Sequence, residues 1–400
     1  MKRSILFVDD EPQILEGLRH RLHRQRARWE MAFVASGNDA LQYLAEHPVD
    51  VLITDMRMPG MDGAQLLQIV QSRHPGVVRI VLSGHAELEA SLRAIPVAHQ
   101  FLNKPSEPGE LENVVERACA LQSLVNDDTV RSLVGQIGAL PPAPRIYGRL
   151  MAALAADKCT AAEVAKLLSQ DVAISAKTLQ MVNSAFFRLS RKVTKVEEAV
   201  VYLGLNTIKQ IVLAAEVFQG AQSPLSKLGN RLDVLQSHAV AVAQIASNMF
   251  KDKSTREDAF TAGLLHDVGK MLLLMSMADR CLKLEDLARE RGLLLYQCER
   301  EEWGATHAEV GAYLLGLWGL PYPLIETVGN HHEPRRVTSQ GFGVLAAVHL
   351  ADGLVRELEP GRAGPQQALW DSEYVESMGV GAEVSRWREL AKEVVQRAKA

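Results

Sequence analysis

The feature that most constrains this chain is an arrangement repeated four times within roughly its first hundred residues. A short apolar run rich in β-formers ends in a polar residue, and a helix-like stretch follows. The runs occupy residues 5–8, 51–54, 80–82 and 101–102. Strands that alternate with helices form a parallel sheet, and the carboxyl ends of parallel strands meet at one edge. The sequence therefore predicts a doubly wound α/β domain with polar side chains gathered along one edge of its sheet.

The polar residues at these four run ends form one chemical set. Asp9 and Asp10 follow the first run, Asp55 the second, Ser83 the third and Lys104 the fourth. Two or three carboxylates are enough to hold Mg²⁺, which keeps several of its waters. An oxygen of Asp55 could then attack phosphorus to form an acyl phosphate. Lys104 and the ion would neutralise the phosphoryl oxygens, and Ser83 would donate a hydrogen bond.

Residues 1–120 resemble the receiver domain of two-component response regulators. The matching segments are Val-Asp-Asp-Glu at 8–11, Asp-Met-Arg-Met-Pro-Gly-Met-Asp-Gly at 55–63, Ser-Gly at 83–84 and Phe-Leu-Asn-Lys-Pro at 101–105. The resemblance implies a flavodoxin-like, five-stranded parallel fold. A flavodoxin-like domain with an incidental acidic edge is the alternative, and four matching strand ends argue against it.

The same resemblance implies roles for individual residues. Asp55 would accept a phosphoryl group from a sensor histidine kinase. Asp9, Asp10 and Asp55 would hold Mg²⁺, with the main-chain carbonyl of Arg57 as a further ligand. Phe101 would be the aromatic residue that swings inward when Ser83 moves, and the bond between residues 104 and 105 would be cis.

A linker helix is expected over residues 106–138. Its apolar residues are spaced alternately by three and four, as in a coiled coil, over about two heptads: Leu111, Val114, Ala118, Leu121 and Val125. One interpretation is a face packed on its own domain. The other is a helix, over residues 108–135, that forms a homodimer or transmits a signal. Two heptads are marginal on their own, so both interpretations stay open.

After a proline-rich break at 140–144 the chain reads as helical. Residues 139–355 predict an all-α bundle, and residues 356–400 a helical tail that ends in an amphipathic helix. Within the bundle, the segment 266–270 lies between apolar residues on both sides, which predicts a buried helix. Because a buried carboxylate needs a cation, Asp267 would pair either with Lys270 or with a metal shared with imidazoles.

Several helices of the bundle carry residues of the types that bind metal ions. His307 follows a capping-box pattern formed by Thr306 and Glu309, and a double histidine precedes Pro334. Imidazoles and carboxylates that converge from several helices are the usual way a bundle builds a metal site. The candidate ligands are His238, His266, Asp267, His307, His331, His332 and Asp352.

This half resembles the HD superfamily of metal-dependent phosphohydrolases, and more fully its HDOD branch. The matching segments are Leu-Pro at 140–141, Asp-Val-Ala-Ile-Ser at 171–175, Asn-Ser-Ala at 183–185, Glu-Ala-Val-Val-Tyr-Leu-Gly at 198–204, Leu-Leu-His-Asp-Val-Gly-Lys at 264–270 and Trp-Gly-Leu-Pro at 318–321. The resemblance implies a signalling output module without an established common activity, in a family where many members have lost parts of the metal set. Here every ligand position is occupied, so bound Fe, Mn or Zn is a second expectation. No Gly-Tyr-Pro segment follows the double histidine, which disfavours cyclic dinucleotide hydrolysis.

Two functions follow from these patterns. The favoured one is a phosphorylation-dependent response regulator whose HDOD domain acts on a protein partner, which the sequence does not name. The alternative is a receiver-controlled, metal-dependent phosphohydrolase or phosphodiesterase, in which His266 and Asp267 hold the metal and Lys270 contacts phosphate. Whether the protein is an enzyme is left open.

Bulk properties exclude other classes. The net charge is −4 and no basic block or nucleic-acid motif occurs, which argues against nucleic-acid binding. No apolar run is long enough to cross a membrane. The N-terminus leads directly into a strand, without room for a signal peptide, and the four cysteines form no paired framework, so we expect a cytoplasmic protein.

Overall fold

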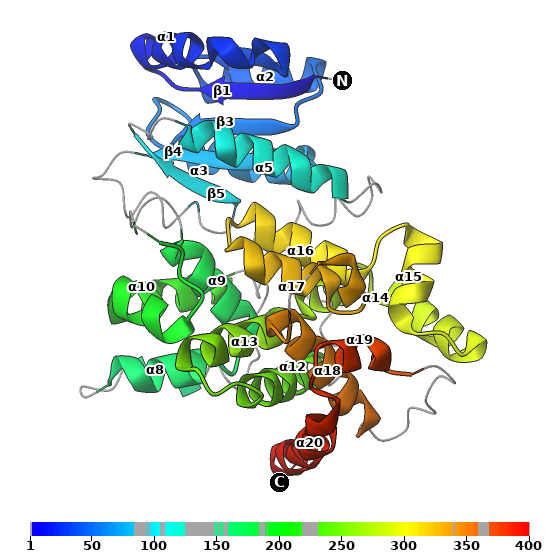
Figure 1. Cartoon of the computed structure of the whole chain (residues 1–400). Helices are drawn as coiled ribbons and strands as arrows, with labels where there is room; N and C mark the ends of the chain where they lie inside the picture. Colours follow the sequence, from blue (N-terminus) through cyan, green and yellow to red (C-terminus); the bar gives the residue numbers. More distant parts are fainter. Residues whose placement is uncertain are drawn as a thin grey trace. The chain divides into compact units, whose positions relative to one another are not determined.

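The computed structural model describes residues 2–83, 94, 97–104, 109–124, 149–150, 153–154, 159–183, 189, 191–217, 231–338, 341–358 and 368–399. The chain divides into two compact units, each described by itself below (Figure 1). The first holds residues 1–139, 180–192 and 315–319, and the second holds residues 140–179, 193–314 and 320–400.

The first unit is built on a five-stranded parallel sheet. Its strands are β1 (Arg3–Val8), β2 (Trp29–Val34), β3 (Val51–Asp55), β4 (Val78–Ser83) and β5 (Gln100–Asn103). They lie in the order β2-β1-β3-β4-β5, and Figure 1 labels β1, β3, β4 and β5 in that order. The register pairs Val8 with Thr54, Asp55 with Leu82, and Ser83 with Asn103. The predicted doubly wound sheet is confirmed, and the polar strand ends share one edge.

Helices flank this sheet. They are α1 (Pro12–Arg21) with the 3₁₀ turn η1 (Leu22–Ala27), α2 (Gly37–Glu46), α3 (Gly63–Arg73) and α5 (Glu110–Leu124). Every residue of the central strand β3 is buried, as expected for a parallel strand covered on both faces. Asp62 caps α3, where its side chain accepts from the Gln65 N–H at 2.8 Å.

Helix α5 uses one face to pack within its own unit. Leu111, Val115 and Ala118 are fully buried, and α5 contacts β3. Two of the five predicted coiled-coil residues, Leu111 and Ala118, are therefore buried within this unit. This agrees with the first interpretation, a helix face packed on its own domain. Residues 125–138 of the expected linker lie outside the described part, and dimerisation through it remains a prediction.

The second unit is helical throughout its described residues. Its helices are α8 (Ala161–Leu168), α9 (Val172–Val182), α10 (Val196–Val217), α12 (Arg231–Asn248), α13 (Lys253–Leu265), α14 (Val268–Arg291), α15 (Leu295–Trp303), α16 (His307–Leu317), α17 (Tyr322–Asn330), α18 (Val344–Glu357), α19 (Ser372–Ser377) and α20 (Val384–Lys399), with 3₁₀ turns η3 (Pro334–Arg336) and η4 (Gly381–Glu383). Helix α12 packs on α13, α18 and α20, and α13 packs on α17 and α18. The predicted all-α bundle is confirmed.

One expectation about this bundle is wrong. The segment 266–270 is not inside a single buried helix, because α13 ends at Leu265 and α14 begins at Val268. Asp267 sits at the N-cap of α14 with φ −101° and ψ 16°. The break allows two buried helix ends to meet, and it turns the Asp267 carboxylate toward the centre of the bundle.

The tail ends in the predicted amphipathic helix. Trp387, Ala391 and Val394 on α20 are buried, and this helix packs on α12 and α18. Among the residues that the structure describes, no helix combines the length and apolar character needed to span a bilayer.

Candidate functional sites

The polar edge of the parallel sheet brings three of the predicted residues into direct contact. Asp9 and Asp55 are buried, and Asp10 beside them is half-buried. Lys104, at the end of β5, places its Nζ 2.6 Å from Asp9 Oδ2 and also donates to Asp55 Oδ1. The ends of β1, β3 and β5 thus form one acidic edge, in which the ammonium of Lys104 contacts Asp9 and Asp55 and Asp10 lies beside them.

The backbone around Asp55 fixes its carboxylate. The Arg57 N–H donates to Asp55 Oδ2 at 2.6 Å, and the Glu11 N–H donates to Asp9 Oδ1 at 3.0 Å. Gly63 explains how the chain returns so closely: a Cβ there would lie 2.1 Å from the Asp55 carbonyl oxygen. The predicted role of the Arg57 carbonyl as a metal ligand stays a prediction.

The electrostatics of this edge fit a divalent cation. Burial raises the pKa of Asp55, although the hydrogen bond and charge of Lys104 act against it. The pKa of Lys104 is raised overall. Burial acts to lower it, but the hydrogen bonds of Lys104 to Asp55 and Asp9 outweigh that effect. Lys104 is therefore firmly protonated, and its one positive charge meets the carboxylates of Asp9 and Asp55, with Asp10 as a third carboxylate at the same edge. An oxygen-liganded ion such as Mg²⁺ matches this excess of negative charge.

The two predicted switch residues are only partly characterised. Ser83 ends β4 and pairs in register with Asn103 of β5, and Phe101 is 5 % exposed. The orientation of the Ser83 side chain and the peptide bond to residue 105 lie outside the described residues. The predicted coupling between Ser83 and Phe101 is therefore untested.

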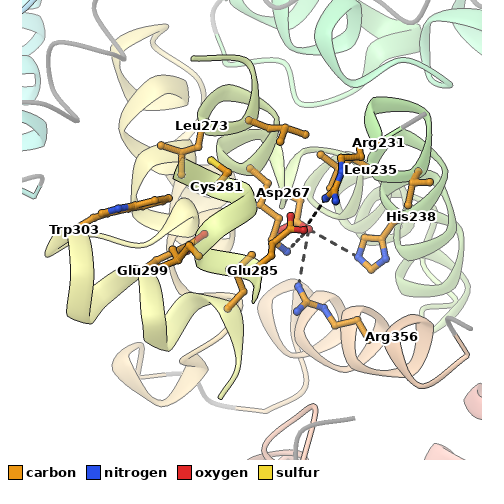
Figure 2. A pocket seen from close by; sticks show the side chains of 15 residues that line it. Arg231, Leu235, His238, Asp267, Leu273, Cys281, Glu285, Glu299, Trp303 and Arg356 are labelled. Carbon is orange, nitrogen blue, oxygen red and sulfur yellow. Dashed lines mark hydrogen bonds and ion pairs between the residues drawn. The ribbon is translucent and has the colours of Figure 1, made fainter. Parts of the chain in front are cut away.

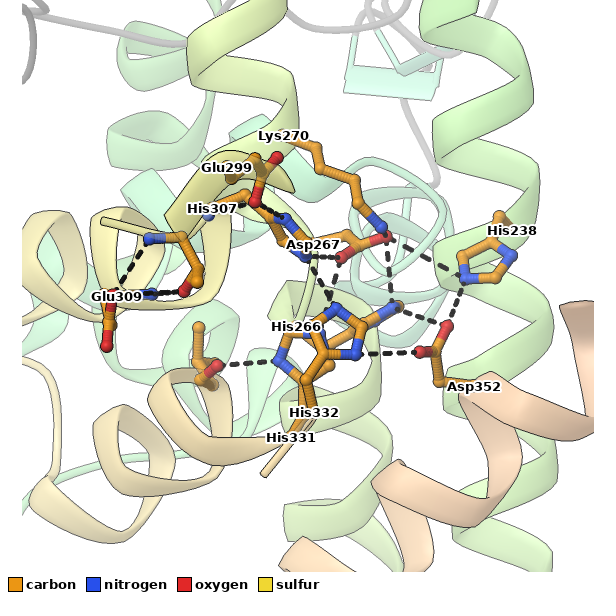
Figure 3. A network of polar contacts seen from close by, with 12 residues as sticks. His238, His266, Asp267, Lys270, Glu299, His307, Glu309, His331, His332 and Asp352 are labelled. Carbon is orange, nitrogen blue, oxygen red and sulfur yellow. Dashed lines mark hydrogen bonds and ion pairs between the residues drawn. The ribbon is translucent and has the colours of Figure 1, made fainter. Parts of the chain in front are cut away.

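The second site lies in the helical bundle, where all seven predicted ligands converge (Figure 3). They come from α12, the junction between α13 and α14, the first turn of α16, the end of α17, and α18. The predicted cap is present, since Thr306 N donates to Glu309 Oε2 at 2.9 Å. The ligands are His238, His266, Asp267, His307, His331, His332 and Asp352, all buried or nearly so.

Asp267 stands between two groups of these residues. Its Oδ1 lies 3.3 Å from His307 Nε2 and 3.6 Å from His331 Nε2. Its Oδ2 lies 3.4 Å from His266 Nε2 and 3.9 Å from His238 Nε2. We call the first set, completed by His332, the α16–α17 group. The second set, completed by Asp352, is the α12–α18 group. Within each group the ligand atoms lie within 4.8 Å of one another.

Hydrogen bonds behind the imidazoles aim them inward. His266 Nδ1 lies 2.6 Å from the Gly263 carbonyl oxygen, and His331 Nδ1 lies 2.7 Å from that of Val328. These carbonyls can only accept, so Nδ1 carries a proton and Nε2 is the ring atom that faces the site. Such outer partners orient metal-binding histidines in general.

Three of the inward atoms have no hydrogen-bond partner among the residues that the structure describes. They are His266 Nε2, His331 Nε2 and Asp267 Oδ1. Leaving buried acceptors unsatisfied costs about 1–3 kcal/mol each. A shared cation would satisfy them, and imidazole with carboxylate suits Zn, Mn or Fe. The residues present therefore fit a metal ion.

Lys270 and two residues absent from the sequence prediction complete the cluster. Lys270 Nζ lies 2.6 Å from Asp267 Oδ2, and Arg356 Nε lies 2.7 Å from Asp352 Oδ1. Glu299 of α15 accepts from the His307 N–H at 2.8 Å, and its Oε2 lies 2.5 Å from His307 Nδ1. Arg356 was identifiable from its place four residues after Asp352. Glu299 carries no such signal.

The pKa shifts follow this charge pattern. Burial would raise the pKa of Asp267 and of Asp352, but the nearby cations and imidazoles hold both well below the usual range. Burial lowers the pKa of His331 to about 4. For His266 burial also acts downward, but Asp267 and Asp352 raise its pKa to about 9. Without metal at neutral pH, His331 is thus neutral and His266 is protonated.

A cavity of about 150 Å³ adjoins this cluster (Figure 2). His238, Asp267, Lys270 and Arg356 lie on its wall, and Arg231 adds a third basic side chain. The rest of the lining is mainly apolar, including Leu235, Leu273 and Trp303. This combination suits a small anionic group with an apolar neighbour.

Two family models match the chain. A response regulator receiver domain matches residues 5–116, and an HDOD domain matches residues 140–334. The chain therefore contains an N-terminal response regulator receiver domain and a C-terminal HDOD domain.

Curated relatives match parts of the chain. An uncharacterized protein of Treponema pallidum is 25% identical over 231 residues, which are 57% of this chain and 44% of that protein. The DNA-binding transcriptional regulator NtrC of Salmonella typhimurium is 32% identical over 160 residues, 38% of this chain and 34% of NtrC. The chain thus spans less than half the length of these relatives.

Among solved structures, a virulence factor of Campylobacter jejuni has a TM-score of 0.52 at 19% identity, and covers 68% of this chain and 97% of its own. At that identity the likeness concerns the fold alone. The MmoQ response regulator of Methylococcus capsulatus has a TM-score of 0.49 at 22% identity, and covers 62% of this chain and 98% of its own.

Proposed function

We propose that this protein is switched by phosphorylation of Asp55 and that its HDOD domain passes the signal on by binding a protein partner. The observation that carries the proposal is the convergence of Lys104 on Asp9 and Asp55 at a buried acidic edge. The donor would be a sensor histidine kinase, and the protein would act in the cytoplasm with it. Mg²⁺ held by Asp9, Asp10, Asp55 and the Arg57 carbonyl would supply positive charge to the transferring phosphoryl group.

Each residue of the acidic edge has its own role in phosphoryl transfer. The Arg57 N–H holds Oδ2 of Asp55, which fixes the plane of the carboxylate that attacks phosphorus. Lys104 keeps its proton and neutralises charge on the arriving group. The bond from phosphorus to the kinase histidine breaks as the bond to Asp55 forms. Ser83 would then donate to the phosphoryl oxygens, and Phe101 would respond.

The output needs only a modest coupling between the two domains. A difference of about 1–3 kcal/mol in partner affinity between the two states is typical of such linkage. Partner capture with phosphorylated and unphosphorylated protein would measure it. Equal capture by the two forms would contradict the proposed output.

The phosphorylation step has a direct test. The full chain is incubated with acetyl phosphate and Mg²⁺, and its intact mass is measured. We expect the mass of one phosphoryl group to be added to the wild type and to Asp62→Asn, since Asp62 caps α3 and is not part of the acidic edge. Asp55→Ala should gain nothing. An equal gain in Asp55→Ala would refute the assignment.

A second function, a metal-dependent phosphohydrolase, is favoured by the complete HDOD cluster. The observation is the set of buried, inward atoms without hydrogen-bond partners in the described structure, beside a cavity whose wall includes Lys270 and Arg356. Asp267 and the imidazoles would hold the ion, which would supply Lewis-acid charge to a phosphoryl group. Lys270 and Arg356 would bind phosphate oxygens and orient them.

Metal analysis separates this second function from the first. Protein purified without added metal is assayed for Fe, Mn and Zn, and then reloaded. If no ion is present and none can be loaded, the phosphohydrolase proposal fails. If an ion is present, phosphomonoesters, phosphodiesters and nucleotides are screened, with Asp267→Ala as the inactive control. Turnover that survives in Asp267→Ala would place the activity elsewhere.

A further inference from the structure

We propose that the receiver domain carries a second interaction surface, on α1 and η1, that binds a carboxylate-rich segment of a partner protein. Residues 19–28 hold five arginines and two histidines and no acidic residue. We call this set the arginine patch: Arg19, His20, Arg21, His23, Arg24, Arg26 and Arg28. The sequence prediction that no basic block occurs overlooked it, because uncharged residues interrupt the arginines. Binding at this patch does not require phosphorylation of Asp55.

The arginine patch faces solvent, while its apolar neighbours face the interior. All its members except Arg21 are exposed, whereas Leu22 and Trp29 are buried. Arg24 and Arg26 have no carboxylate within ion-pair distance among the described residues. Arginine is always charged at neutral pH, and neighbouring like charges repel one another. An anionic partner that neutralises these charges is therefore favoured.

The arginine patch lies toward the edge of the sheet opposite the acidic edge. Arg3, at the start of β1, pairs in register with Trp29 at the start of β2, and its N–H donates to the Arg28 carbonyl oxygen at 3.1 Å. Asp9 and Asp55 stand at the carboxyl ends of their strands instead. The six residues of β1, at about 3.3 Å each, separate the two edges by about 20 Å. A partner on the patch is therefore remote from the phosphorylation site.

The receiver domain itself shows what this surface can bind. Arg21 Nη2 lies 3.5 Å from Glu112 Oε2, and Arg28 Nη1 donates to Glu116 Oε1. Both glutamates are on α5 and are four residues apart, so they share one face of that helix. Two arginines of the patch thus already hold an acidic helix face, as the planar guanidinium suits carboxylates. The remaining arginines offer the same chemistry to an acidic segment of another protein.

A hollow beside the arginine patch extends its positive charge. It has a volume of about 610 Å³, and Lys2, Arg3 and Arg28 line it together with Glu116. Among the described lining residues, three basic side chains thus face one carboxylate. The potential in such a hollow attracts a further anionic group.

Extended polyanions fit this surface less well than an acidic protein segment. Outside residues 19–28 the chain carries a net charge of −9, since the whole chain carries −4 and this segment +5. A membrane or a DNA duplex is charged over a large area, so it would also meet the negative remainder. Single-stranded RNA stacks on exposed aromatic rings. Here Trp29 is buried, and Arg19 covers the Phe33 ring at 4.9 Å.

The test measures binding of a fluorescein-labelled oligoglutamate peptide to the full chain at low ionic strength. Arg24→Gln with Arg26→Gln removes two exposed charges, and we expect the Kd to rise about tenfold. The matched control is Arg73→Gln with Arg386→Gln, which removes the same charge from exposed positions on α3 and α20. The control should leave the Kd within about twofold of the wild type. Equal Kd values for the two double variants would overturn the location of the surface.

The opposite change should strengthen binding. Glu112→Gln with Glu116→Gln frees two arginines of the patch, so the Kd should fall about tenfold. Glu302→Gln with Glu376→Gln removes the same negative charge from exposed positions in the second unit and should change the Kd much less. No difference between these two variants would show that the α5 glutamates and the peptide do not share a surface.

Three further outcomes bear on the kind of partner and on independence from phosphorylation. A wild-type chain that does not bind oligoglutamate would overturn the surface. Tighter, patch-dependent binding of a DNA duplex or of phosphatidylglycerol vesicles would overturn the class of partner. We expect equal Kd values before and after treatment with acetyl phosphate and Mg²⁺, and a change would overturn the independence of the two edges. Phosphorylation itself is measured by intact mass, so failure of either proposal leaves the other standing.

Discussion

The two candidate sites use the same residue types and differ in how their charges are balanced. At the acidic edge of the receiver domain, one lysine contacts Asp9 and Asp55, and Asp10 follows Asp9 in the sequence. In the HDOD cluster, Asp267 and Asp352 each have a cation of their own, and five histidines surround them. The receiver edge retains an excess of negative charge, whereas the HDOD cluster is nearly neutral, although the aspartates of both sites are mostly buried.

This difference matches two kinds of task. A site that gains and loses a phosphoryl group must tolerate a change of charge, which an edge with excess negative charge and a bound divalent ion allows. A buried cluster held by fixed cations resists such a change, because each uncompensated charge is costly in the interior. We therefore expect the first site to be a switch and the second to keep one constant charge state once its ion is bound.

The largest expected effect comes from exchanging one aspartate in each site. Asp55→Asn should abolish phosphorylation by acetyl phosphate and leave HDOD metal content unchanged. Asp267→Asn should abolish metal binding and leave phosphorylation unchanged, because each site lies within its own unit. Intact mass and metal analysis on the same preparations measure both. Loss of both properties in either variant would show that the sites are not independent.

Replacing either of two glycines with alanine should have the next largest effect, a loss of domain stability. Each glycine allows two backbone segments to approach closely behind one of the sites. A Cβ at Gly63 would lie 2.1 Å from the Asp55 carbonyl oxygen, and one at Gly269 would lie 1.9 Å from that of His307. Because backbone atoms cannot turn aside, each alanine variant should lose about 3 kcal/mol of stability in its own domain. Hydrogen exchange resolved along the chain would locate each loss.

Gly17→Ala is the matched control for these glycine variants. Gly17 is exposed in α1, and a Cβ there would meet nothing within 4 Å. Replacing it should stabilise the helix by about 0.5–1 kcal/mol. If Gly63→Ala and Gly269→Ala behaved like Gly17→Ala, the close approaches behind the two sites would be wrong.

The receiver edge was predictable from the sequence for a simple reason. Parallel strands bring their carboxyl ends together, so the residues after four apolar runs had to meet. Asp9, Asp55 and Lys104 are in contact as that rule requires. The helical ligands were predicted as a set, because histidines and aspartates recur at helix ends and one helix face. Their division into two groups around Asp267 depends on helix crossings that periodicity does not encode.

The missed features share this dependence on tertiary packing. The break between α13 and α14 was hidden because both flanks are apolar, as in one buried helix. Glu299 reaches His307 from a separate helix, so no spacing in the sequence links the two residues. The pairing of Arg356 with Asp352 could have been predicted from their i,i+4 spacing on one helix. A lone arginine on a helix is, however, far more often exposed than buried.

The metal-free HDOD domain should be most stable near pH 6.5. The pKa of His266 is raised to about 9, so its stabilising proton is fully bound below pH 6.5 and is lost as the pH rises through 9. The pKa of His331 is lowered to about 4, so the unfolded chain takes up a proton below pH 6.5 that the folded state resists. Each effect amounts to up to about 3 kcal/mol.

Urea unfolding in the presence of a chelator at pH 5, 6.5 and 9, followed by hydrogen exchange in α13 and α17, would check this maximum. In the receiver domain, burial raises the pKa of Asp55. This shift changes the stability of the receiver domain only in the acid range. A stability that changes in one direction across the whole range, or equally in both domains, would contradict the pKa shifts of the two histidines.

The smallest expected effect concerns Glu299, which supports the HDOD site without facing the ion. Its Oε2 accepts from the His307 N–H and lies 2.5 Å from His307 Nδ1, which holds Nε2 toward Asp267. Glu299→Gln removes one negative charge and weakens this hold, so metal affinity should fall about 10–100-fold. Competition with a chelator measures the affinity. Glu302→Gln on the same helix is the matched control, because Glu302 is exposed and should leave the affinity unchanged. Equal affinities for the two variants would mean that His307 needs no charged partner, and that the HDOD cluster is held by its helices alone.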